Sequence, residues 1–122
     1  MEAHVNPRMA DGVAVLEVAG ELDLYTSPKL KTALDTVLTE GHVRLIVDLL
    51  AATYLDSTAL SILSSALQRA RDAGGNLGVI YNQPQIDRMF TLTGLKEIFP
   101  IFSSEEEALA AARSWSTVPR EV

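Results

Sequence analysis

Apolar residues recur along the chain with two different periods, and the shorter period predicts strands. Residues Gly12 to Ala19 alternate and then run apolar, as a strand does. Residues Arg44 to Leu50 form a short apolar run that is typical of a central strand buried on both faces. Two further runs, Leu77 to Tyr81 and the proline-containing Ile98 to Phe102, predict a strand and an edge strand. The segment from Met1 to Ala10 is compatible with an edge strand and indicates nothing more.

Between these strands the apolar positions follow the helical period. Ser27, as an N-cap followed by proline, predicts the start of a first helix that ends at a glycine. A longer amphipathic helix begins at Asp56 and ends at a glycine pair. Pro84 to Leu92 predicts a short helix, and a capping box at Ser104 opens a last one toward Trp115. The alternation predicts an α/β fold with a mixed or mostly parallel central sheet of about four to five strands and about four helices.

Length and composition indicate one domain. The 122 residues are 48% hydrophobic, so we expect a single domain over residues 1–122, with its core at 12–114 and a frayed tail at 117–122. The absence of cysteine excludes disulfides and thiolate metal sites. No leader pattern is present and no apolar stretch reaches the ~18 residues of a membrane span, so we expect a soluble cytoplasmic protein. A net charge of −6 opposes nucleic-acid binding and favours a protein partner.

The segment from Tyr54 to Leu60 places a carboxylate and two hydroxyls at the start of the long helix. Asp56 is suited to the N-cap, and Ser57 and Thr58 then occupy the first turn. A phosphate added there would meet free N–H groups and the positive end of the helix dipole, so the fold could accept the charge. An ordinary helix cap explains the same residues. In either case the helix buries a leucine stripe: Leu60, Leu63 and Leu67.

Catalytic chemistry is hard to find in the sequence. The two histidines, His4 and His42, have no metal-ligand spacing. Gly74 to Gly78 precedes a strand, whereas a phosphate-binding glycine loop follows one. Ser57 lies in no nucleophile elbow and has no histidine nearby in sequence. We therefore expect a protein that is not an enzyme and has no metal or cofactor.

Three parts of the chain resemble the STAS domains, and among them the bacterial anti-sigma-factor antagonists. Gly20 to Pro28, a predicted loop before the first helix, is similar to the G-E-[LI]-D loop of that family. Val47 to Leu49 with Tyr54 to Leu60 resembles its strand and D-S-[ST]-G-L phosphorylation motif. Phe90 to Leu95 resembles its F-x-x-[ST]-G-L segment. The combination is specific, although each part alone is weak.

The resemblance implies a partner switch. In this family the unphosphorylated antagonist binds an anti-sigma factor that is also a serine kinase, which releases a sigma factor. Phosphorylation of the motif serine ends the binding, and a serine phosphatase restores it. Ser57 matches that serine, with Thr58 as a second candidate. The implied partner-binding residues are Glu21, Asp23, Thr26, Asp56, Ser57 and Thr58.

Two structural expectations follow from the resemblance. The loop from Gly20 to Thr26 should lie beside Asp56, because loops that follow parallel strands converge at one edge of a sheet. Ala59 stands where the family has glycine, so we expect its methyl group to project where the kinase approaches and to impede access.

Two other classes share parts of this pattern. A receiver domain would place a phosphorylated aspartate at Asp48, but the adjacent acidic pair it needs after the first strand is missing. A STAS interaction module of another assembly, such as a stress-signalling or lipid-transport complex, would have the same fold without control by phosphorylation.

Overall fold

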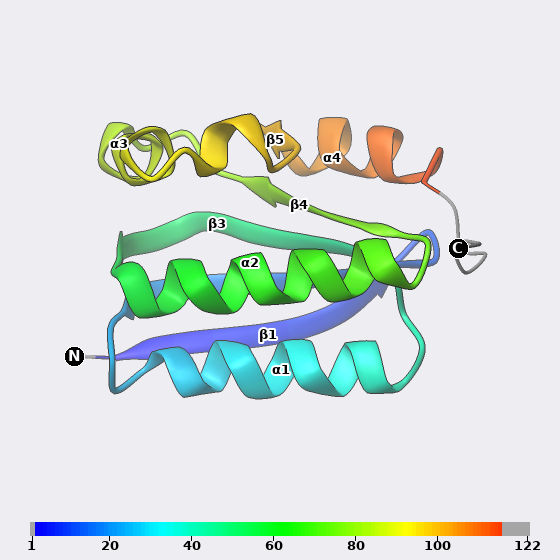
Figure 1. Cartoon of the computed structure of the whole chain (residues 1–122), viewed down its shortest axis with the longest axis horizontal. Coiled ribbons are helices and arrows are strands. Elements are labelled where there is room, and N and C mark those ends of the chain that lie inside the picture. Colours follow the sequence, from blue (N-terminus) through cyan, green and yellow to red (C-terminus); the bar gives the residue numbers. More distant parts are fainter. Residues whose placement is uncertain (1, 116–122) are drawn as a thin grey trace.

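The computed structural model describes residues 2–115 and is built on one five-stranded sheet with the strand order β1-β2-β3-β4-β5 (Figure 1). β1 (Ala3–Ala10) pairs antiparallel with β2 (Val13–Leu22). β3 (Arg44–Leu55), β4 (Asn76–Ile80) and β5 (Ile101–Phe102) continue the sheet in parallel. The predicted α/β class and mixed sheet are confirmed, with β3 at its centre as expected.

Within residues 2–115, four α-helices cover the sheet. α1 (Ser27–Thr39) and α2 (Ser57–Asp72) lie side by side on one face, where Figure 1 shows them in front of the strands. α3 (Pro84–Leu92) is followed by a 3₁₀ turn, η1 (Leu95–Glu97). α4 (Glu105–Ala112) packs on the opposite face against β3, β4 and β5. Parallel neighbours are thus joined by helical crossovers, as this sheet type requires.

The core confirms the hydrophobic pattern of the central elements. Leu45, Ile46 and Val47 of β3 are fully buried, because helices cover both faces of this strand. The predicted leucine stripe of α2 is also buried, at Leu60, Leu63 and Leu67. The main apolar cluster therefore lies between the sheet and α1 and α2, and a smaller one lies under α4.

Several element boundaries differ from the prediction. β2 runs through Leu22, and β3 runs to Leu55 although the apolar run stops at Leu50. The pairing of β2 with β3 shifts register at two places, which interrupts the inward-outward alternation. The amide of Gln83 donates to backbone carbonyls in the irregular stretch, including Leu49 at 2.7 Å and Ala52 at 2.7 Å. The bulged end of β3 therefore lacks the period that marks a strand.

At the two ends of the chain, the structure adds one edge strand and shortens another. The segment that sequence reasoning left open forms β1, whose Pro7 fits an edge strand because proline donates no backbone hydrogen bond. The last strand covers only Ile101–Phe102, since η1 and a turn occupy the residues before it. The predicted frayed tail at 117–122 lies outside the described residues. Among residues 2–115, no helix is long and apolar enough to span a membrane.

Candidate functional site

The carboxyl ends of β2 and β3 place two aspartates side by side. Leu22 and Leu55 are partners in the parallel register, and the backbone N–H of Asp56 donates to the carbonyl of Leu22 at 3.0 Å. Asp23 follows Leu22 directly, so the loop before α1 lies against the start of α2. The structure therefore brings together the two segments that the sequence singled out.

Asp56 caps α2. Its backbone is extended (φ −98°, ψ −177°), and its carboxylate Oδ1 accepts from the N–H of Ala59 at 3.0 Å. Ser57 is the first helical residue and is exposed, while Thr58 behind it is half-buried. The Ser57 hydroxyl is thus accessible at the helix end where N–H groups and the dipole favour negative charge.

A hydrogen-bonded turn holds Asp23. Its Oδ1 accepts from the N–H of Tyr25 at 2.8 Å and of Thr26 at 2.9 Å. The buried Thr26 hydroxyl donates to the carbonyl of Glu21 at 2.6 Å and accepts from the N–H of Asp23 at 2.9 Å. The Thr26 N–H, and after it the Tyr25 N–H, lower the pKa of Asp23 below its usual value. Asp23 is therefore a fixed negative charge near the start of α2.

The start of α1 corrects one prediction, because Ser27 is not the N-cap. Thr26 holds that position, and Ser27 is the first helical residue, with its N–H donating to the carbonyl of Asp23 at 2.9 Å. The Ser27 hydroxyl is buried and makes no hydrogen bond within the described structure. Backbone carbonyls replace a capping side chain here, because Asp23 accepts from the Ser27 N–H and Thr26 accepts from the Lys29 N–H at 3.0 Å.

Ala59 corrects a second expectation. Its exposed fraction is 0%, and it belongs to the main apolar cluster under α2. The methyl group therefore points into the core and not toward a partner that approaches Ser57. Alanine in place of the family glycine adds apolar packing and helix propensity without narrowing access to the hydroxyl.

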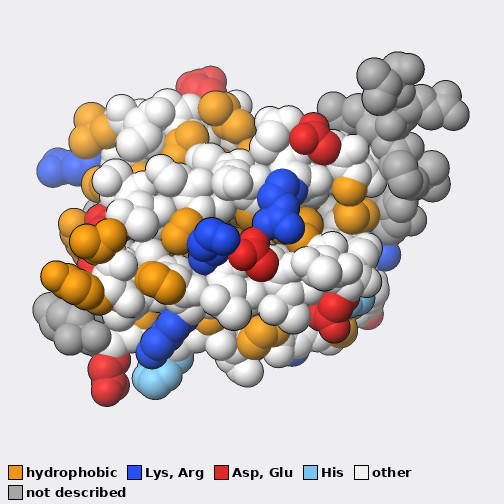
Figure 2. All heavy atoms as spheres, turned by 60° about the horizontal axis from the view of Figure 1, so that its bottom comes forward, with side chains coloured by type: hydrophobic (Ala, Val, Ile, Leu, Met, Phe, Trp, Pro, Cys, Tyr) orange, Lys and Arg blue, Asp and Glu red, His pale blue; other side chains and the backbone are white. Residues whose placement is uncertain are grey.

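Large apolar side chains surround this acidic end of the molecule and were not among the predicted site residues. Leu24 and Tyr25 in the loop before α1 are 63% and 86% exposed, and Leu92 at the end of α3 is 75% exposed. Tyr54, which pairs with Glu21, is half exposed. Figure 2 shows apolar side chains gathered at the left, the end where α1 and α2 begin. Leu24 and Tyr25 could have been found in the sequence, as bulky apolar residues in a loop with no place in the core pattern.

A shallow groove links Ser57 to the segment after α3. Its volume is about 370 Å³, and its lining residues are Ser57, Leu60, Ser61, Ser64, Thr93 and Leu95. Thr93 and Leu95 belong to the third segment that suggested the family, so two of the matching segments meet at this groove. No group of three or more His, Asp or Glu side chains among residues 2–115 is arranged to hold a metal ion.

The family is shown by comparison with known proteins. The STAS domain model matches residues 4–108, and this chain belongs to that family. An anti-sigma-B factor antagonist of Listeria monocytogenes is 36% identical over 90 residues, which cover 74% of this chain and 79% of that protein. An anti-sigma-F factor antagonist of Mycobacterium tuberculosis is 33% identical over 103 residues, 84% of each chain.

A solved structure agrees with this assignment. The crystal structure of an anti-sigma factor antagonist from Mycobacterium paratuberculosis is similar with a TM-score of 0.83 and 31% identity. The match covers 93% of this chain and 96% of that one. The family resemblance inferred from the three sequence segments is therefore confirmed.

Proposed function

We propose that this protein is an anti-sigma-factor antagonist that binds an anti-sigma factor with serine kinase activity and thereby releases a sigma factor. The similar proteins from Listeria and Mycobacterium carry the name of such antagonists. The observation that carries the proposal is the exposed Ser57 at the capped start of α2, with Asp23 and Asp56 beside it. The exposed Tyr25 supports a protein partner, because tyrosine is enriched among the residues that dominate binding energy in protein interfaces. The exposed Leu92 adds apolar surface of the kind that marks interaction sites.

Ser57 is the proposed switch residue. The kinase would transfer the terminal phosphoryl group of ATP to the Ser57 Oγ, with loss of the hydroxyl proton and release of ADP. The phosphate adds about 1.5 to 2 negative charges next to Asp23 and Asp56. The free N–H groups at the start of α2 allow the domain to carry this charge without refolding.

The added charge would act at the interface. After phosphorylation, a partner that covers Ser57 must desolvate the phosphate together with the carboxylates of Asp23 and Asp56. Like charges brought together in an interface cost several kcal/mol. Each ~1.4 kcal/mol is a tenfold loss of affinity. Phosphorylation would thus release the anti-sigma factor to capture its sigma factor again, and a serine phosphatase would restore the antagonist.

Mass spectrometry of the phosphorylated residue tests the proposal. Each anti-sigma kinase of the source organism would be purified and incubated with this protein and ATP. We expect one kinase to add a single phosphate, which Ser57→Ala abolishes and the matched variant Thr58→Ala leaves in place. A phosphate found only on Thr58 would refute the assignment of Ser57. No phosphate with any of these kinases would support an unregulated STAS binding module instead.

A further inference from the structure

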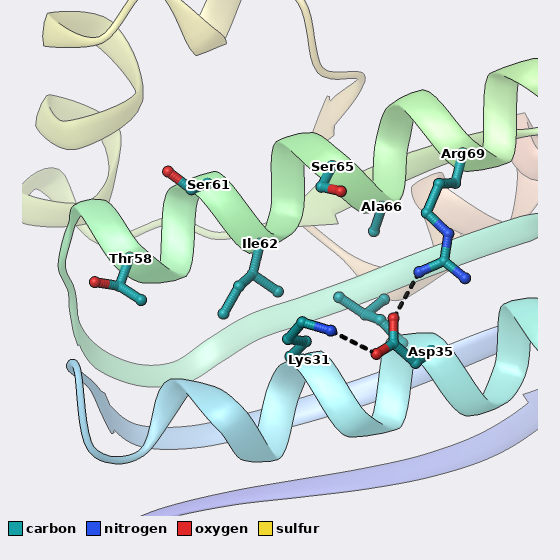
Figure 3. Close-up of a pocket in the computed structure, with 9 residues that line it drawn as sticks. Lys31, Asp35, Thr58, Ser61, Ile62, Ser65, Ala66 and Arg69 are labelled. Carbon is teal, nitrogen blue, oxygen red and sulfur yellow. Dashed lines mark hydrogen bonds and ion pairs between the residues drawn. The ribbon is translucent and has the colours of Figure 1, made fainter.

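A second groove lies between α1 and α2, on the other side of α2 from the groove that contains Ser57. Its volume is about 240 Å³. Apolar side chains of Leu34, Ile62 and Ala66 line it, and Thr58, Ser61 and Ser65 add hydroxyls. Figure 3 shows Ile62 and Ala66 pointing from α2 toward α1. The groove therefore has apolar walls and hydroxyl groups along α2.

One end of the groove carries an excess of positive charge. Asp35 of α1 accepts from the Nζ of Lys31 at 2.8 Å and from the Nη1 of Arg69 at 2.6 Å, as Figure 3 shows. Two cations share one carboxylate, so this end has a net charge of +1 in a chain of −6. The side chains of Lys31 and Arg69 are 62% and 46% exposed. This end of the groove can attract an acidic group.

The size of the groove favours a side chain over a small molecule. Pockets for small-molecule ligands usually measure about 300 to 1,000 Å³. A groove of about 240 Å³ is smaller than that range and suits one bulky apolar side chain. Apolar walls beside surplus positive charge thus fit a protein segment that carries a bulky apolar residue next to an acidic one.

This groove is continuous with the proposed interface. Ser61 lines both grooves, one on each side of α2. An interface of ordinary size covers about 800 Å² per partner, a disc of roughly 16 Å radius. Ser65 lies eight residues beyond Ser57, about 12 Å along the helix axis. A partner centred on Ser57 therefore reaches the groove.

We infer that the α1–α2 groove anchors the anti-sigma partner through an acidic segment with a bulky apolar residue, and that this contact is insensitive to phosphorylation of Ser57. The inference rests on the proposed function. Thr58 and Ser61 line the end of the groove near Ser57, whereas Ser65 and Arg69 line the far end, about 12 Å or more along α2 from Ser57. The anchoring contact lies at this far end, where charge at Ser57 is largely screened because the Debye length is about 8 Å at physiological ionic strength. The groove would contribute equally to the affinity of the phosphorylated and unphosphorylated forms, while the charge at Ser57 would set the difference in affinity between the two forms.

A tryptophan that fills the groove tests whether its contribution to affinity is independent of the state of Ser57. Ser65→Trp is compared with Thr36→Trp, an exposed position on α1 that does not line the groove. Both tryptophan variants are made twice, once with Ser57 unchanged and once combined with Ser57→Asp. Titration calorimetry then measures the affinity of each protein for the anti-sigma kinase that binds the wild-type chain. We expect Ser65→Trp to weaken binding about tenfold in both backgrounds, because sites more than about 10 Å apart act additively. Thr36→Trp should change nothing.

Charge reversal tests the acidic part of the segment. Arg69→Glu should weaken binding, whereas Arg113→Glu, with the same change in net charge but outside the groove, should not. Unchanged affinity in both Ser65→Trp and Arg69→Glu would overturn the inference and leave the proposed function standing. A Ser65→Trp effect confined to one Ser57 background would overturn the insensitivity to phosphorylation. A change of oligomeric state in Ser65→Trp with unchanged kinase affinity would assign the groove to a second copy of this chain. Absence of binding by every kinase would refute the proposed function, and the inference with it.

Discussion

Replacing Thr26 by valine should loosen the turn that holds Asp23. The change keeps the shape of a buried side chain but removes a hydroxyl that donates to the Glu21 carbonyl at 2.6 Å and accepts from the Asp23 N–H at 2.9 Å. A polar group left unpaired costs about 1 to 3 kcal/mol when buried. Glu21 and Asp23 are only half-buried, so water can replace part of each bond, and we expect a total loss of about 2 kcal/mol.

Thermal and urea unfolding measure this loss. For a chain of this length, about 2 kcal/mol corresponds to a fall in Tm of roughly 8 °C. Thr26→Ser is the matched control, because it keeps the hydroxyl and should lose less than about 1 kcal/mol for one buried methyl group. The Thr26 hydroxyl also lies 3.1 Å from Oδ1 of Asp23, and its O–H dipole helps to lower the pKa of that carboxyl. An NMR titration should therefore show the pKa of Asp23 closer to its ordinary value in Thr26→Val. Equal stability of Thr26→Val and wild type would show that these bonds do not hold the loop.

Three further predictions concern the same end of the molecule. Ala59→Gly should lower the free energy of unfolding in urea by about 1 to 2 kcal/mol, because it loses helix propensity and one buried methyl group. Its phosphorylation rate should be unchanged, and a faster rate would mean that the methyl group obstructs the kinase. Asp56→Ala should lose about 1 kcal/mol while Asp56→Asn loses little, because asparagine also caps helices, and equal losses would argue against the cap. Because folding lowers the pKa of Asp23, its contribution to the free energy of unfolding is fully present above the pKa of the unfolded chain and is lost as the pH falls through the folded pKa. From about pH 4 downward, the free energy of unfolding of Asp23→Asn should therefore fall less steeply with pH than that of the wild type.

Periodicity and caps in the sequence predicted the helices and the central strand because those signals are local. The buried run of β3 and the leucine stripe of α2 depend only on spacing. The capping aspartate at Asp56 was likewise visible, since its bond to Ala59 spans three residues. Such features give the fold class without knowledge of tertiary contacts.

The remaining features depend on contacts between distant segments. The extension of β3 to Leu55 depends on a register shift against β2 and on hydrogen bonds from the side chain of Gln83. The residues of β3 alone indicate neither of these contacts. The direction of the Ala59 methyl group depends on which face of α2 the sheet covers. The groove between α1 and α2 exists only after two helices pack, so no pattern within either helix reveals it.

Titration calorimetry of the anti-sigma kinase with phosphorylated and unphosphorylated chain tests the central claim most directly. Protein carrying phosphate on Ser57 alone would be separated from unmodified protein, and both would be titrated in the presence of adenine nucleotide. We predict that the phosphate weakens binding by about a hundredfold or more, because several kcal/mol of like-charge repulsion at ~1.4 kcal/mol per tenfold amounts to at least that. Circular dichroism should show the same fold for both forms. Equal affinity of the two forms would contradict a switch at Ser57.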